Sequence, residues 1–372
     1  MKELICVFTL LLSGLIHPTL GSTGDKLKTY RDCLHLCTST GCAQAVQNTY
    51  KCRHALACHE STRPFVPVSL QITGWGCKDD CRYLCMADVE HRRRLSGKPP
   101  SKYYGKWPFR RVLGMQEAAS VLFSLANLCA HLYGLSYLLD KSSLLSSTPT
   151  EDQKNQDAAA APSASSASAL SQGRYPYMWL WLVYAGLHLN TWVWSAVFHT
   201  RDTRLTERLD YCSAITVIAA GLVVALARTL NLRSKTAAAL LALAVASGLG
   251  IHLNYMLNVK FDYDWNVKVC ATIGALSGLA WAVWVFTVAR KQGHPGRYFM
   301  LAFLVLTNAA VLLEVLDFPP LFGPKDPDHS EMGLGLLDAH AMWHAATVPL
   351  TILFYRFIGT DLAWWYGKKH DD

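Results

Sequence analysis

Seven apolar segments, each long enough to cross a bilayer, follow one another in this 372-residue chain after residue 110. About 20 apolar residues cross the hydrocarbon core as a helix, and in hydrocarbon only helices and closed barrels satisfy their own backbone hydrogen bonds. The segments lack the period-2 alternation of strands. The sequence therefore predicts an all-α membrane protein, a seven-transmembrane helix bundle. The segments are residues 115–139, 177–198, 211–230, 236–257, 267–289, 298–316 and 339–358.

The composition agrees with a membrane protein. The chain is 51% hydrophobic and only 17% charged, against roughly 25% charged residues in soluble globular domains, which excludes an ordinary cytosolic protein. A formal net charge of +8 would suggest nucleic acid in a soluble chain, but here the Lys and Arg residues sit mainly at helix ends and in loops. We therefore expect a protein integral to the membrane, with no nucleic-acid partner.

The N-terminus is typical of a secretory signal peptide, which we place at residues 1–21. The apolar run 4–16 follows Met1-Lys2, and small residues suit cleavage near residue 21. An uncleaved anchor is the alternative, but the run is shorter than the ~20 residues that a span needs. With a cleaved signal and seven spans, the chain after the signal is luminal and the C-terminus is cytosolic.

A dense set of cysteines follows the signal, and we assign it to a cysteine-rich luminal domain at residues 22–110. An even number of closely spaced cysteines in an oxidising compartment predicts about four disulfides and leaves their connectivity open. The spacing of some of them also suits a zinc-thiolate cluster, which is the less favoured alternative. The eight cysteines are Cys33, Cys37, Cys42, Cys52, Cys58, Cys77, Cys81 and Cys85.

The transmembrane domain is expected at residues 111–360. It is interrupted by a linker rich in Ser and Ala at residues 140–174, which predicts a disordered cytosolic segment. Residues 361–372 form the expected cytosolic tail, and its two lysines are weak evidence for residence in the early secretory pathway. The positive-inside rule agrees only in part, because several arginines after the second span fall on the luminal side.

Histidines at the luminal ends of the helices carry the functional signal, because ionisable side chains within spans are costly. His340 and His344 lie one turn apart at the start of the last span, and a helical pair at this spacing can hold one metal ion. His199 ends the second span, which reaches the same face. We therefore predict a tetrahedral Zn²⁺ site on these three residues, with water in the fourth position. His252 remains an alternative third ligand, and hydrogen bonding inside the bundle is the alternative for the pair.

Three further residues accompany the histidines. Ser195 lies one turn before His199, Asp210 begins the third span, and Asp338 precedes the last one. We expect Asp210 to orient and deprotonate the water and Ser195 to hydrogen-bond the developing oxyanion. Asp338 would orient the imidazole of a metal ligand by hydrogen-bonding the ring nitrogen that does not bind the metal. The alternatives are helix packing for Ser195 and capping of the third helix for Asp210. Ser195 is less favoured as a nucleophile, because no Gly-x-Ser-x-Gly motif frames it.

These motifs resemble a known family. The histidines with Ser195 and Asp210 look like the metal motif of a seven-helix superfamily that includes alkaline ceramidases and adiponectin receptors. Over nearly the whole mature chain, the sequence is similar to the post-GPI attachment to proteins factor 3 family. The stretches that carry this similarity are Gly105-Lys106-Trp107-Pro108-Phe109 and residues 30–33, 74–81, 198–202, 261–263, 316–322 and 337–344.

The resemblance implies a GPI-specific phospholipase A2-like hydrolase that remodels GPI anchors. Its substrate would be the sn-2 acyl ester of the phosphatidylinositol on GPI-anchored proteins, and its cofactor would be Zn²⁺. We expect it in the endoplasmic reticulum membrane, with the Golgi membrane as the alternative. A ceramidase-like amidohydrolase remains an alternative function, and so does a non-enzymatic seven-helix receptor or transport chaperone with structural zinc.

Overall fold

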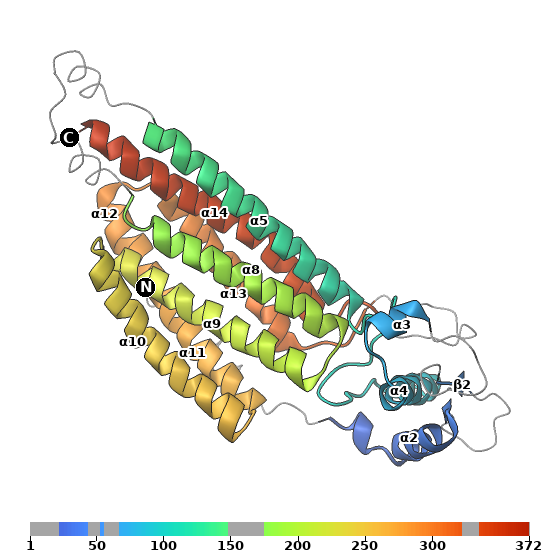
Figure 1. The fold of residues 1–372 in the computed structure, drawn as a ribbon. Helices are drawn as coiled ribbons and strands as arrows, with labels where there is room; N and C mark the ends of the chain where they lie inside the picture. The colour runs from blue at the N-terminus through green and yellow to red at the C-terminus, as the bar shows by residue number, and fades with distance from the viewer. Residues whose placement is uncertain (1–21, 44–52, 56–66, 148–174, 322–334, 372) are drawn as a thin grey trace.

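The computed structural model describes a small cysteine-rich region followed by a bundle of long helices (Figure 1). The residues that it describes are 22–43, 53–55, 67–147, 175–321 and 335–371. The signal peptide expected at residues 1–21, the linker from residue 148 onward, Cys52 and Cys58 lie outside the described residues.

Within the described residues, seven helices of 20 or more residues form the bundle. Five are long and apolar enough to cross a membrane: α5, α9, α10 with η3, α11 with η4 and α12, and α13. Of the other two, α8 is rich in Trp and His, α14 carries charged residues as well, and both pack against α5. The chain is therefore a mostly helical, multi-pass membrane protein. The bounds are α5 Ala118–Ser147, α8 Met178–Thr200, α9 Arg204–Thr229, α10 Lys235–Asn254, η3 Tyr255–Val259, α11 Tyr263–Val283, η4 Trp284–Ala289, α12 Arg290–Gln292, α13 Gly296–Leu316 and α14 Ala339–Asp371.

Helix boundaries differ from the sequence expectation in three main places. α5 continues to Ser147, so residues 140–147, expected as the start of a disordered linker, are helical. α9 begins at Arg204, before the expected start at residue 211, because Thr203 caps the helix and forms a capping box with Thr206. Asp210 therefore lies well inside α9, and the alternative that it caps the third helix is wrong. α14 continues to Asp371, through the segment expected as a tail at 361–372.

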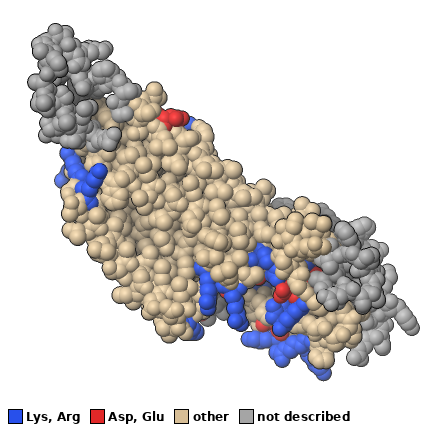
Figure 2. Space-filling view, in the orientation of Figure 1, with Lys and Arg blue, Asp and Glu red and all other residues tan. Residues whose placement is uncertain are grey.

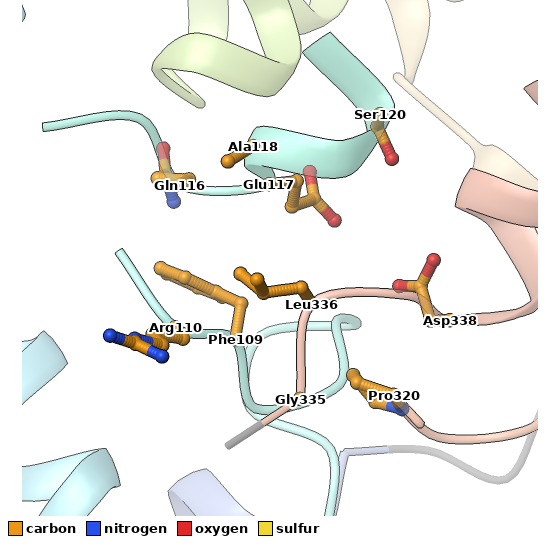
Figure 3. Close-up of a pocket in the computed structure, with 10 residues that line it drawn as sticks. All are labelled: Phe109, Arg110, Gln116, Glu117, Ala118, Ser120, Pro320, Gly335, Leu336 and Asp338. Atoms are coloured by element: carbon orange, nitrogen blue, oxygen red, sulfur yellow. The ribbon is translucent and has the colours of Figure 1, made fainter. Parts of the chain in front are cut away.

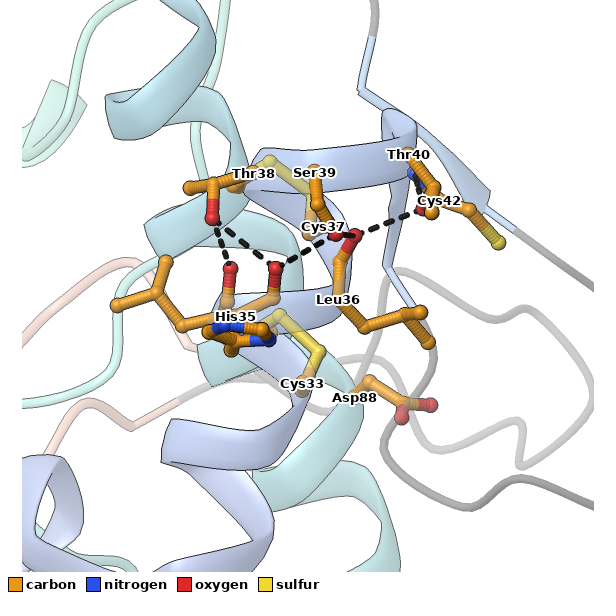
Figure 4. Close-up of a disulfide and its surroundings, with 12 residues drawn as sticks. Cys33, His35, Leu36, Cys37, Thr38, Ser39, Thr40, Cys42 and Asp88 are labelled. Atoms are coloured by element: carbon orange, nitrogen blue, oxygen red, sulfur yellow. Dashed lines mark hydrogen bonds between the residues drawn. A yellow bond between two sulfur atoms is a disulfide. The ribbon is translucent and has the colours of Figure 1, made fainter.

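Two disulfides hold the cysteine-rich region together by joining α2 to α4. They pair Cys33 with Cys85 and Cys37 with Cys81 (Figure 4), and Cys42 and Cys77 are disulfide-bonded as well. The prediction of disulfides near the N-terminus is confirmed. The bounds here are η1 Gly24–Lys26, α2 Lys28–Thr40, β1 Cys42–Ala43, β2 Arg53–His54, α3 Val68–Ile72 and α4 Cys77–Leu95, with β1 and β2 paired antiparallel.

The cysteine-rich region contacts one end of the bundle, which we call the proximal end. Arg111 donates to Asp80 at 2.8 Å, and Arg201, just after α8, donates to Asp79 at 2.6 Å. The Trp75 indole N–H donates to the carbonyl of Gly114 at 2.8 Å. On the face shown in Figure 2, the middle of the bundle carries no charged side chains, while Lys and Arg gather toward its ends. This distribution is typical of helices that cross a membrane.

A buried polar cluster closes the opposite, distal end of the bundle. Asp361 of α14 is 2% exposed and accepts hydrogen bonds from the guanidinium of Arg228 on α9 and the hydroxyl of Tyr175. It also accepts from Nε2 of His294 at 3.0 Å. Nδ1 of His294 accepts from the backbone N–H of Gly296, so the proton lies on Nε2. The cluster thus ties three parts of the bundle to one carboxylate.

Replacing Asp361 tests this cluster. Asp361→Asn leaves the Arg228 guanidinium buried without its counter-charge, which costs about 3–5 kcal/mol for a buried pair. We expect a clearly lower melting temperature of the purified protein in detergent, whereas Asp140→Asn, at an exposed site on α5, should melt like the wild type. The double variant Arg228→Met, Asp361→Leu should recover part of the loss. An unchanged melting temperature of Asp361→Asn would contradict the stabilising role.

Candidate metal centre

Three histidines converge at the proximal end of the bundle. His199 is the last residue but one of α8, and His340 and His344 lie one turn apart in the first turns of α14. Nε2 of His340 lies 3.3 Å from Nε2 of His199 and 2.9 Å from Nε2 of His344. One ring nitrogen of each residue lies within 4.8 Å of the others. The sequence predicted that these three histidines lie together, and in the fold they are neighbours.

The second nitrogen of each imidazole is hydrogen-bonded away from the centre. Nδ1 of His199 lies 2.8 Å from the Glu117 carboxylate, and Nδ1 of His340 lies 2.9 Å from the Glu314 carboxylate. A carboxylate only accepts, so both Nδ1 atoms carry the proton and leave the Nε2 lone pairs facing the common centre. Metal-binding histidines almost always have such a partner, which fixes the tautomer and the ring orientation.

The third imidazole is held by hydroxyl groups. Nδ1 of His344 lies 3.2 Å from Oγ of Ser124, which lies 3.0 Å from Oγ of Ser195. If the imidazole donates to Ser124, the Ser124 hydroxyl is free to donate to Ser195. Both serines are buried, at 0% and 4% exposure. Ser195 thus contacts His344 only indirectly, because Ser124 of α5 lies between them and bonds to both.

The geometry fits a zinc ion. A tetrahedral ion with Zn–N distances of roughly 2.0–2.1 Å separates its ligand nitrogens by about 3.3 Å, and the two measured Nε2 separations, 2.9 and 3.3 Å, are close to this value. His199 and His344 are buried, whereas the His340 side chain is 39% exposed. A ligand could therefore approach the centre past His340.

The two predicted aspartates, Asp210 and Asp338, have different surroundings in the fold. Asp210 is buried on α9 and interacts electrostatically with His340, and no other described residue forms a hydrogen bond to its carboxylate. Asp338 instead accepts from the backbone N–H of Ala341 at 2.7 Å and caps the start of α14. The carboxylates that orient ligand imidazoles are Glu314 for His340 and Glu117 for His199, and the expectation that Asp338 orients a ligand imidazole is not met within the described residues.

The other histidines lie apart from the centre. His252, the alternative third ligand, places Nε2 3.0 Å from Asn266 on the neighbouring α11. His131 and His188 stack on each other in the middle of the bundle, with ring centroids 4.2 Å apart. Neither pair belongs to the group of converging nitrogens.

Three functional residues were not predicted from the sequence: Glu117, Glu314 and Ser124. Glu314 had a signal of its own, since it is an acidic residue within the apolar segment 298–316 and such residues are costly in a membrane. Glu117 lies just before α5 and looks like an ordinary residue at a helix start. Its role depends on contacts with His199 and Lys106, which are distant in the sequence.

Glu117, the hydrogen-bond partner of His199, forms an ion pair with Lys106. Burial raises the pKa of Glu117, but the Lys106 ammonium and His199 outweigh it and hold the pKa below its usual range. Glu117 also lines a small pocket between the segment that leads into α5 and the segment that leads into α14 (Figure 3). Phe109, Leu336 and Asp338 line the same pocket, which lies beside the histidine centre and not within it.

Fold and site together define a multi-pass helical membrane protein with a candidate metal centre beside a disulfide-bonded N-terminal region. The model of the Per1-like family matches residues 67–362, and the chain belongs to this family. The resemblance seen in its motifs is confirmed.

Relatives cover almost the whole chain. It is 34% identical to the GPI-specific phospholipase A2-like PGAP3 of Danio rerio, over 92% of each chain. It is 30% identical to the protein of the same name in Homo sapiens, over 97% of this chain and 96% of the relative. It is 32% identical to Post-GPI attachment to proteins factor 3 of Drosophila melanogaster, over 95% and 93%. No solved structure matches it.

Removing a converging imidazole should remove bound metal. We expect His344→Ala, purified in detergent and equilibrated with zinc, to lose the zinc that the wild type retains after gel filtration, as measured by inductively coupled plasma mass spectrometry. His252→Ala serves as the matched control, because it removes a buried histidine of the same bundle outside the centre. Equal zinc contents in His344→Ala and the wild type would contradict the site.

Proposed function

We propose that this protein is a zinc-dependent lipid acyl hydrolase that removes the sn-2 acyl chain from the phosphatidylinositol of GPI-anchored proteins. The observation that carries the proposal is the convergence of the Nε2 atoms of three histidines. The Nδ1 atom of each of these histidines is hydrogen-bonded to a protein side chain. The names of the relatives, GPI-specific phospholipase A2-like and post-GPI attachment factor, suggest the anchor lipid as substrate.

The depth of the site suits an ester of a membrane lipid. His199 lies at the end of α8, and His340 lies at the start of α14. The hydrocarbon core is about 30 Å thick, so the ends of spanning helices lie near the polar interface. The ester groups of a phospholipid lie at the same level. The substrate could therefore reach the site without leaving the bilayer.

The residues around the centre supply the remaining chemistry. A zinc ion held there would lower the pKa of a bound water toward about 7 and polarise the ester carbonyl. Asp210 is the proposed base, since its buried carboxylate has no hydrogen-bond partner among the described residues and interacts with His340. It takes the proton of the attacking water and returns it to the departing lysolipid alkoxide as the acyl C–O bond breaks. The products are a fatty acid and a lysolipid.

The two serines play different parts in this proposal. Ser124 orients His344 through Nδ1. Ser195 is the proposed donor to the oxyanion. It accepts from Ser124 when the imidazole donates to Ser124, which leaves its own hydroxyl hydrogen free for the substrate.

The disulfides support an orientation. Disulfides persist in oxidising compartments such as the lumen of the endoplasmic reticulum. We therefore propose that the cysteine-rich region is luminal and the C-terminus cytosolic, in the membrane of the endoplasmic reticulum or alternatively the Golgi. GPI-anchored proteins would meet the enzyme there as partners.

The base can be separated from the metal. In cells that lack the protein, we expect the wild type to restore removal of the sn-2 chain, as measured by mass spectrometry of GPI lipids. Asp210→Asn should keep its zinc, and its rate of sn-2 chain removal should fall by about 10²–10⁴-fold, which is the usual contribution of a general base. Asp140→Asn, expressed at the same level, is the matched control and should act like the wild type.

The other outcomes assign other functions. If Asp210→Asn and His344→Ala both restore remodelling fully, the centre is not the catalyst and a transport chaperone becomes the better account. If even the wild type leaves the GPI pool unchanged, the substrate is wrong, and turnover of ceramide should be measured next.

A further inference from the structure

Lys106 belongs to a turn that is built into the cysteine-rich region. Tyr103 and Lys106 exchange two backbone hydrogen bonds, of 2.8 and 3.0 Å. The residues between them, Tyr104 and Gly105, both have positive φ, at 49° and 87°, as in the tight turns of hairpins, where glycine is favoured. Tyr103 is buried and donates to Glu90 of α4 at 2.8 Å. The backbone that carries Lys106 is therefore fixed to the core of the region.

The Lys106 side chain reaches into the bundle. Its ammonium lies 2.6 Å from Glu117 and 3.2 Å from Asp202, the second residue after α8. It also lies 4.0 Å from the centre of the Phe198 ring, the neighbour of His199 in sequence. The side chain is only 20% exposed. A cation of the cysteine-rich region is thus enclosed by two carboxylates and an aromatic face of the bundle.

One oxygen atom joins this cation to the centre. Oε2 of Glu117 accepts from both Nζ of Lys106 and Nδ1 of His199. The backbone N–H of Glu117 also donates to the carbonyl of His199 at 3.0 Å. An ammonium bonded to this oxygen holds the carboxylate in place against His199, and outer partners of this kind contribute strongly to metal affinity.

We infer that Lys106 is a positioning residue of the metal centre, which acts on His199 through Glu117 and so makes the cysteine-rich region part of the site. This inference rests on the metal centre of the proposed function. It gives a role to the Gly105-Lys106-Trp107 motif, which the catalytic proposal leaves unused.

A second contact of the same segment points the same way. Lys102 pairs with Asp317, and the indole N–H of Trp107 donates to that carboxylate at 2.9 Å. Asp317 ends α13 with a positive φ of 42°, one turn after Glu314, which holds His340. The segment that positions His199 thus also holds the helix end that carries the partner of His340.

The zinc affinity of the full-length protein in lipid nanodiscs tests the inference. Competition with a zinc chelator should show that Lys106→Met binds zinc about 10–100-fold more weakly than the wild type, the usual effect of losing an outer partner. Lys106→Arg should restore most of the affinity, because it keeps the charge. Lys98→Met is the matched control, since Lys98 is exposed in the same region, and should bind zinc like the wild type.

A double-mutant cycle distinguishes positioning from a general loss of structure. If Lys106 acts through Glu117, Lys106→Met should lower the affinity little further in a Glu117→Gln background. An equal loss of zinc affinity in both backgrounds would overturn the inference. Melting temperatures measured for every variant show whether unfolding causes the loss.

Two results would overturn the inference and leave the proposed hydrolase intact. One is wild-type zinc affinity in Lys106→Met, and the other is a loss of affinity that Lys106→Arg does not restore. The expected cycle in a protein without lipid turnover would support the inference and refute the hydrolase. A wild type that binds no zinc would overturn both.

Discussion

An imidazole that gives one ring nitrogen to a metal needs a hydrogen-bond partner for its other nitrogen, which fixes the tautomer and the ring orientation. Glu117, Glu314 and Ser124 provide that partner to the three converging histidines. They come from the start of α5, the end of α13 and the first turns of α5. The packing of the bundle brings these partners to the histidines, because α5 packs against both α8 and α14, and α13 packs against α14.

The ion pairs of the bundle are concentrated toward its two ends. At the distal end, Asp361 gathers Arg228, His294 and Tyr175, next to an aromatic core that includes Trp284. At the proximal end, the carboxylates hold imidazoles whose other nitrogens remain open to a ligand. The distal cluster joins helices through ion pairs and hydrogen bonds, whereas the imidazoles of the proximal end have lone pairs that can bind a ligand. The same kinds of side chain thus stabilise one end and, in the proposed function, hold a metal at the other.

The sequence predicted the helices and the three histidines well, because apolar length and the i, i+4 spacing are local properties. It failed where the answer depends on contacts between distant segments. Glu117 and His199 are 82 residues apart, and although Glu314 stands out within its apolar segment, the sequence does not show which side chain it contacts. The start of α9 was missed because Thr203, a cap, lies outside the apolar run. The connectivity of the cysteines was open for the same reason, since pairing is a property of the tertiary fold.

The backbone pairing between Glu117 and His199, together with the ion pair to Lys106, has a consequence for how such proteins can be divided. A boundary drawn at residue 110 would separate the lysine from its carboxylate. The bundle alone is then not the smallest working unit. With the inferred role of Lys106, exchange of N-terminal regions between relatives would preserve the metal centre only when the turn around residue 105 and the carboxylate before α5 are transferred together.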